Sequence, residues 1–177
     1  DSKKTVYLFC DEFTNYNDTE IGIKGILLLE KLGYEVLMTD HEESGRTWLS
    51  KGLLREAKKI INKNISIFSK IINEETPLIV IEPSAILTFI DEYVDLADDE
   101  NFEAAKKLEK NVFLIDEFIA KEIDNGNIIV NLFTKEKKNI KLHGHCQQKA
   151  LTTAAASAKI LSFPENYSVE TIPSGCC

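Results

Sequence analysis

The first 81 residues alternate short apolar runs with amphipathic stretches, and this alternation strongly limits the fold. Residues 5–10, 34–38 and 77–81 are typical of strands, because each is short, apolar and rich in aromatic or β-branched side chains. Residues 20–32 and 50–72 carry apolar positions at helical spacing. Strands joined in succession by helices form a parallel sheet with right-handed crossovers. The sequence therefore predicts an α/β fold.

The rest of the chain continues the alternation less regularly. We expect helices over 83–96, 101–121 and 147–161, and strands over 127–133, 139–143 and 167–172. Ligands of open parallel sheets gather at the carboxyl ends of the strands. Residues that directly follow the predicted strands are therefore the first candidates for a functional site.

An internal repeat relates the two parts of the chain. When Cys10 is placed on Cys146, the strand that begins at Tyr34 aligns with the strand that begins at Tyr167, apart from a small length difference in the intervening helix. Each part then consists of a strand, a cysteine, a helix and a second strand. A repeat of this kind indicates duplicated structural units.

The aligned halves end in different residue pairs. Nine positions after the aligned tyrosines lie Glu43 and Cys176, so Glu43-Ser44 occupies the place of Cys176-Cys177. We expect two pseudo-repeated halves, residues 1–98 and 99–177, each with a short, mostly parallel sheet flanked by helices. The first half has kept one cysteine and lost the pair, and the second half is incomplete at its end.

The second half concentrates soft metal ligands. Cys146, Cys176 and Cys177 provide three thiols, which suit an iron-sulfur cluster or, as an alternative, tetrahedral zinc. A fourth ligand stays open among Cys10, His143, His145 and a residue beyond position 177. The two histidines flank Gly144 and also suit a supporting role, in which they orient the thiolates.

Polar residues after the first strands have plainer interpretations. Asp11 and Glu82 end neighbouring strands, where helix capping is favoured over acid–base chemistry, although Glu82 stays a candidate supporting residue of the site. Cys10 is expected to be a small buried residue, and His41 a solvated loop residue. Arg46 suits either an anion site or the surface.

Charge and hydropathy exclude several function classes. The net charge of −8 leaves no basic stripe for nucleic acid. The apolar runs are shorter than the roughly twenty residues of a membrane span, and the start of the chain lacks signal-peptide character. We therefore expect a cytoplasmic setting, where clustered cysteines indicate metal or redox chemistry more than disulfides.

Several short motifs together resemble a known family. The chain is similar to the cysteine-rich CCG domain of heterodisulfide reductases, and more closely to the C-terminal region of FAD-linked oxidases of the D-2-hydroxyacid dehydrogenase type. The resemblance spans nearly the whole chain and is carried by segments that recur in this order: Phe13-Thr14-Asn15-Tyr16, Gly45-Arg46-Thr47 with Ser50-Lys51-Gly52-Leu53, Glu82-Pro83-Ser84, and His143-Gly144-His145-Cys146 with Lys149-Ala150-Leu151.

The resemblance implies electron transfer from a flavin through an iron-sulfur centre held by Cys146, Cys176 and Cys177. FAD would bind on another domain, because no Gly-rich nucleotide fingerprint follows any strand here. The implied partners are the flavin-binding and ferredoxin-like domains of a parent oxidoreductase, which leaves open a peripheral association with the membrane through that enzyme. The family continues past the cysteine pair, so this chain is expected to be a fragment.

Departures from the family pattern keep other functions open. Glu43, Ser44 and Ala85 stand where members with a full first repeat carry cysteines, so no cluster is expected in the first half. One alternative is a cluster-free docking or structural domain of the same oxidase. Another is a thiol–disulfide redox site that uses Cys146 against the vicinal pair.

Overall fold

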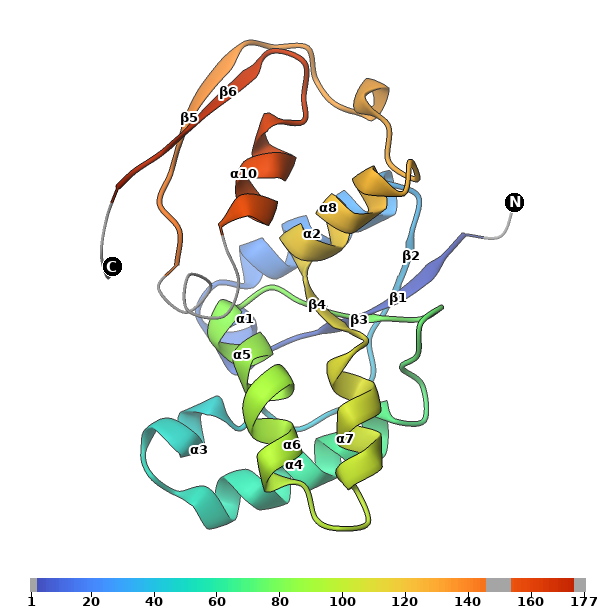
Figure 1. The fold of residues 1–177 in the computed structure, drawn as a ribbon, viewed down its shortest axis with the longest axis vertical. Helices are drawn as coiled ribbons and strands as arrows, with labels where there is room; N and C mark the ends of the chain where they lie inside the picture. The colour runs from blue at the N-terminus through green and yellow to red at the C-terminus, as the bar shows by residue number, and fades with distance from the viewer. Residues whose placement is uncertain (1–2, 146–153, 174–177) are drawn as a thin grey trace. The chain divides into compact units, whose positions relative to one another are not determined.

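The computed structural model describes residues 3–145 and 154–173 (Figure 1). The chain divides into two compact units, Asp1–Leu114 and Ile115–Cys177. The boundary between the two repeats at residues 98 and 99 is a division of the sequence and stays a prediction. Within the described residues, none of the helices has both the length and the apolar character needed to cross a membrane.

The first unit is built on a four-stranded parallel sheet. Its strands follow the order β2-β1-β3-β4 and comprise β1 (Thr5–Phe9), β2 (Glu35–Leu37), β3 (Leu78–Val80) and β4 (Val112–Leu114). The central position of β3 explains its composition, because all three of its residues are buried. The predicted α/β class with a parallel sheet is confirmed.

Helices connect and cover these strands. They comprise α1 (Glu12–Tyr16), α2 (Thr19–Lys31), α3 (Arg46–Ser50), α4 (Leu54–Phe68), α5 (Pro83–Leu87), a π-helix (Thr88–Glu92), α6 (Tyr93–Leu96) and α7 (Phe102–Glu109). The main core lies between one face of the sheet and α4, α6 and α7, which pack together in Figure 1. Ile61, Ile65 and Phe68 of α4 follow helical spacing and are buried there, and each stabilises the fold by about 1.5–3 kcal/mol.

The second unit contains α8 (Ile115–Asp124), a 3-10 helix (Val130–Leu132), β5 (Lys138–Leu142), α10 (Ala155–Ser162) and β6 (Tyr167–Thr171). β5 and β6 form a two-stranded parallel sheet and lie side by side in Figure 1. Both α8 and β6 pack against α10. The strands predicted over 139–143 and 167–172 are therefore confirmed to within one residue.

Both units contain the same strand–helix–strand arrangement. Thr5 of β1 pairs with Glu35 of β2, 30 positions later in the chain. Lys138 of β5 pairs with Tyr167 of β6, 29 positions later. Helices α1 and α2 lie between β1 and β2, and among the described residues α10 lies between β5 and β6, so both units contain a parallel strand pair with similar spacing.

Two predicted elements are wrong. The helix expected over 101–121 is interrupted by β4, because Val112–Leu114 pairs with β3 and the Leu78 N–H donates to the Asn111 carbonyl at 2.9 Å. The strand expected over 127–133 contains a 3-10 turn, in which the Leu132 N–H bonds locally to the Ile129 carbonyl. The beginning of the helix predicted over 147–161 lies outside the described residues, and α10 accounts for its end.

Candidate functional site

The candidate residues of the first unit lie where its parallel strands end. Cys10 and Asp11 directly follow β1, and Glu82 follows β3, which is the neighbour of β1. Parallel strands bring their carboxyl ends to one edge of the sheet. The sequence-based placement of these residues is therefore correct.

Asp11 is a fully buried helix cap. Its Oδ1 accepts hydrogen bonds from the backbone N–H groups of Phe13 and Thr14, each at 2.9 Å, and its Oδ2 accepts one from Thr14 Oγ1 at 2.6 Å. Burial raises the pKa of Asp11 above its ordinary value, and the Thr14 hydrogen bonds oppose that rise. The negative charge of Glu82 raises it further. Asp11 thus serves α1, as the capping interpretation expected.

Glu82 caps the next helix in the same way. Its Oε1 accepts hydrogen bonds from Ser84 N–H at 3.1 Å and Ser84 Oγ at 2.7 Å, with Pro83 in the first turn of α5. Proline suits this position because its missing N–H would have no helical partner. The carboxylate is engaged by the start of α5, so the structure favours capping for Glu82 as well.

Cys10 and His41 are linked through the backbone. The Cys10 N–H donates to His41 Nε2 at 3.4 Å, and His41 Nδ1 lies 2.7 Å from the Glu42 carbonyl. In these contacts Nε2 is the acceptor and Nδ1 faces the Glu42 carbonyl. The imidazole also stacks on Phe9, with ring centroids 4.2 Å apart. The prediction of a solvated His41 is therefore wrong, because ring stacking and the backbone contact hold it against the sheet.

The Cys10 thiol is half-buried and poorly suited to act as a free nucleophile. Burial raises its pKa, and the adjacent Asp11 charge raises it further. The thiol form therefore dominates at neutral pH.

Glu12 anchors the loop at Glu43 and Ser44, which the internal repeat predicts to stand in the place of a cysteine pair. Its Oε2 accepts a hydrogen bond from Ser44 N–H at 3.0 Å, while its Oε1 accepts from Ser44 Oγ at 2.7 Å and Thr47 Oγ1 at 3.1 Å. Burial opposes ionisation of Glu12, but hydrogen bonds from Ser44 and Thr47 outweigh it, so the pKa is lowered. Glu12 is an ionised anchor for this loop.

Two further side chains, those of Asn64 and Tyr93, hold the same loop through hydrogen bonds. Asn64 of α4 donates to the Glu43 carbonyl at 2.8 Å and to Tyr93 Oη at 2.9 Å, and it accepts from Glu42 N–H. Tyr93 donates to the Ser44 carbonyl at 3.2 Å. Complete burial raises the pKa of Tyr93, so it stays a neutral donor. We call Glu12, Ser44, Thr47, Asn64 and Tyr93 the loop-anchoring network.

Arg46 lies beside this network in an ion pair. Its Nη1 is 2.9 Å from Glu92 Oε1, at the end of the π-helix. The second oxygen of Glu92, Oε2, is buried and has no hydrogen-bond partner in the described part of the chain. Sequence reasoning missed Glu12, Asn64 and Tyr93, because no local motif marks contacts between residues so far apart.

The second-unit candidates are only partly described. His143 is exposed and His145 is half-buried, and both follow β5. Cys146, Cys176 and Cys177 lie outside the described residues, so their role as ligands of iron-sulfur or zinc stays a prediction. Within residues 3–145 and 154–173, no three His, Cys, Asp or Glu side chains are grouped so that they could hold a metal ion.

The pairing of β5 and β6 nevertheless constrains where the cysteine segments start. Leu142 at the end of β5 pairs with Thr171 at the end of β6, and the Ile172 N–H donates to the Leu142 carbonyl at 2.8 Å. Cys146 follows Leu142 by four positions, and Cys176 follows Thr171 by five. Both cysteine-bearing segments therefore leave the sheet at the same end of adjacent strands. Such a start fits a shared set of thiolate ligands.

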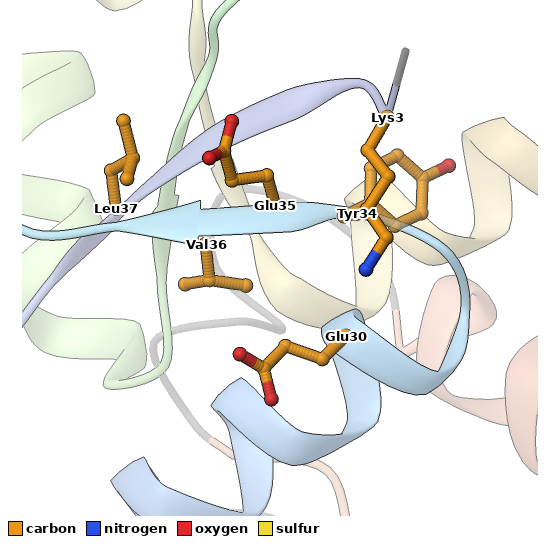
Figure 2. Close-up of a pocket in the computed structure, with 6 residues that line it drawn as sticks. All are labelled: Lys3, Glu30, Tyr34, Glu35, Val36 and Leu37. Atoms are coloured by element: carbon orange, nitrogen blue, oxygen red, sulfur yellow. The ribbon is translucent and has the colours of Figure 1, made fainter. Parts of the chain in front are cut away.

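A separate hollow of about 510 Å³ lies along β2, lined by Lys3, Glu30, Tyr34, Glu35, Val36 and Leu37. Figure 2 shows Val36 pointing to the side of β2 where Glu30 of α2 lies, and Glu35 and Leu37 pointing to the opposite side. None of the candidate residues above lines this hollow. We therefore do not assign it to the candidate site.

Comparison with known proteins points to one group of enzymes. The chain is 25% identical over 175 residues to a D-2-hydroxyglutarate dehydrogenase of Escherichia coli K12, covering 98% of this chain and 16% of that protein. It is 22% identical to the enzyme of the same name from Pantoea ananatis, covering 94% of this chain and 16% of that protein. For the Haemophilus influenzae enzyme the identity is 20%, covering 70% of this chain and 11% of that protein.

The chain thus spans about one sixth or less of the length of these curated relatives. No protein-family model matches it, and no solved structure does. All three relatives carry the name D-2-hydroxyglutarate dehydrogenase.

Proposed function

We propose that this chain is the cysteine-rich electron-transfer module of a larger FAD-linked oxidoreductase that acts on a 2-hydroxy acid. Relatives named D-2-hydroxyglutarate dehydrogenase match most of the chain, and the chain corresponds to a small share of each. The module would receive electrons from reduced flavin on another domain. It would pass them on through an iron-sulfur centre.

The main support for this proposal is the in-register pairing of β5 with β6. Because of this pairing, the segments that lead to Cys146 and to Cys176-Cys177 begin at the same end of one small sheet. Thiolates are the usual ligands of iron-sulfur clusters, and three are available here. The chemistry of the donor set therefore fits such a cluster, with the fourth ligand open among Cys10, His143, His145 and a residue beyond 177.

The remaining residues of the chain would support the centre. His143 and His145 precede Cys146 closely in the sequence, so their imidazole N–H groups would orient the thiolates and tune the potential. The first unit would act as a rigid scaffold, because the loop-anchoring network holds Glu43-Ser44, which aligns with the cysteine pair of the second half.

The test is metal analysis of the anaerobically purified parent protein. We expect iron, acid-labile sulfide and a broad visible absorbance. In Cys146→Ser all three should fall by the content of one cluster, because clusters of a ferredoxin-like domain would stay, whereas the exposed control Ser162→Ala should keep the wild-type content. Loss of the cluster in Cys10→Ala would assign Cys10 as the fourth ligand. Iron-free protein that still passes electrons from the hydroxy acid to its acceptor would refute the proposal.

A second candidate is a cluster-free docking or structural domain of the same enzyme. It is favoured by the first unit, in which hydrogen bonds from Glu12, Asn64 and Tyr93 anchor the loop at Glu43 and Ser44. Under this alternative, Cys146→Ser would leave turnover unchanged. A thiol–disulfide site would instead require a mixed disulfide trapped at Cys146, and failure to trap one under oxidant would count against it.

A further inference from the structure

β5 has one paired edge and one edge without a partner strand among the described residues. The Lys138 N–H donates to the Asn166 carbonyl at 3.2 Å, and the Leu142 carbonyl accepts from Ile172 N–H, so these residues of β5 face β6. Backbone groups alternate in direction along a strand. The N–H and C=O groups of Asn139 and Lys141 therefore point away from β6, at the other edge.

The first unit shows what occupies the corresponding edge. β1 lies between two strands: the Lys4 carbonyl accepts from Glu35 N–H toward β2, and the Tyr7 N–H donates to the Pro77 carbonyl ahead of β3, each at 2.9 Å. The spacing of 30 positions between β1 and β2 matches the 29 between β5 and β6. The edge of β5 at Asn139 and Lys141 therefore corresponds to the edge of β1 that pairs with β3.

Exposure of the small sheet indicates that it is incomplete. Lys138, Asn139 and Lys141 are exposed, and even Ile140 and Leu142 are only half-buried. Two-stranded sheets have marginal stability alone, and parallel sheets are normally covered on both faces. An unpaired edge also offers a row of backbone groups to another strand.

We propose that a third strand, from the segment that follows residue 177 in the parent polypeptide, pairs in parallel with β5 along Asn139 and Lys141. This inference rests on one part of the proposed function, namely that the chain is a module of a longer polypeptide. The matched region makes up only 16% of each of two relatives, which supports that part. The partner is thus an extended segment recognised by backbone hydrogen bonds.

The first unit also supports the order and direction of the third strand. There the chain runs through β1, α2 and β2, and then through α4 to β3, which is parallel to β1 and lies on its far side. The second unit has the first three of these steps in β5, α10 and β6. Its third strand therefore follows β6 in the chain and leaves the outer edge of β6 free, just as β2 has no strand at its outer edge among the residues that the structure describes.

Residue-resolved hydrogen–deuterium exchange on the parent protein and on this chain tests the inference. We expect the Asn139 and Lys141 amides to exchange at least 100-fold more slowly in the parent. The Val169 and Thr171 amides, which point to the outer edge of β6, serve as internal controls and should exchange fast in both. Equal rates for Asn139 and Lys141 in the two proteins would overturn the inference. So would protection that rises with the concentration of the isolated chain, since a second copy would then cover the edge.

Proline variants provide an independent arm, because proline removes a backbone N–H and is tolerated only at free edges. In the parent, Lys141→Pro should speed exchange of the other β5 amides at least tenfold, while Thr171→Pro should leave them unchanged. Equal effects of the two variants would contradict a third strand at β5. Hydroxy-acid oxidation by the wild-type parent is measured separately: activity without protection of Asn139 would refute only the strand, and protection without activity would refute only the proposed function.

Discussion

Replacing Glu12 by glutamine should selectively weaken the first unit. Glutamine keeps an oxygen where Oε1 accepts from Ser44 Oγ and Thr47 Oγ1, but it places an amide N–H₂ where Oε2 now accepts from Ser44 N–H. One charged hydrogen bond is lost to a donor–donor contact, and two become neutral. Because hydrogen bonds to charged groups contribute about 1.5–3 kcal/mol and neutral ones about 1, the free energy of unfolding should fall by at least about 2.5 kcal/mol at pH 7.

The assay is urea unfolding of wild type, Glu12→Gln and the control Glu20→Gln. Glu20 pairs with Lys24 one helical turn away, and both side chains are more than 70% exposed. Such a surface pair contributes at most about 0.5 kcal/mol. The control removes one negative charge, as Glu12→Gln does, but it leaves the hydrogen bonds of Glu12 in place.

The pH dependence of the free energy of unfolding tests the anchoring role of Glu12 a second time. The folded pKa of Glu12 lies below its ordinary value, so ionised Glu12 stabilises the fold above the unfolded glutamate pKa of about 4.3. That contribution is lost as the pH falls through the lowered folded pKa. The difference in free energy of unfolding between wild type and Glu12→Gln should therefore be largest at pH 7 and should shrink below about pH 4. The anchoring role of Glu12 would be refuted if Glu12→Gln lost no more free energy of unfolding than Glu20→Gln does. It would also be refuted if that loss stayed constant with pH.

Three further predictions concern the same unit. Tyr93→Phe should lower the free energy of unfolding by about 1–3 kcal/mol in urea titrations, because it leaves the Asn64 donor and the Ser44 carbonyl without their shared partner. Gly22→Ala should cost about 1–3 kcal/mol by thermal unfolding, since its Cβ would meet Thr14 Cγ2 at 2.9 Å, and the added change Thr14→Ser should recover part of the loss. Alkylation of Cys10 at pH 7 should be slower than that of a free model thiol, because burial and Asp11 raise its pKa; an equal or faster rate measured by mass spectrometry would contradict this.

Elements with a strong local pattern were predictable from sequence. The strands β1, β2 and β3 and the helices α2 and α4 follow residue periodicities of about 2 or 3.6, which depend only on neighbouring positions. β4 was missed, since Val112–Leu114 also fits a helical pattern. Only its pairing with β3 across more than thirty positions decides in favour of a strand.

The same division applies to the candidate site. Capping by Asp11 and Glu82 was predictable, because each binds backbone groups two or three residues ahead. The contact of Glu12 with Ser44 joins residues 32 positions apart, and His41 reaches Cys10 across 31. No local pattern records such contacts, because they form only when parallel strands bring their ends together.

The sequence by itself therefore determined the α/β class and the repeated strand–helix–strand order, and it predicts soft-ligand chemistry for Cys146, Cys176 and Cys177. All three inferences depend on residue type and local spacing. The tertiary structure alone decided that Glu43-Ser44 is fastened by Glu12, Asn64 and Tyr93, and that the segments leading to the cysteines leave β5 and β6 at one end. Burial and strand register set both features. They are properties of the packed chain rather than of any short segment within it.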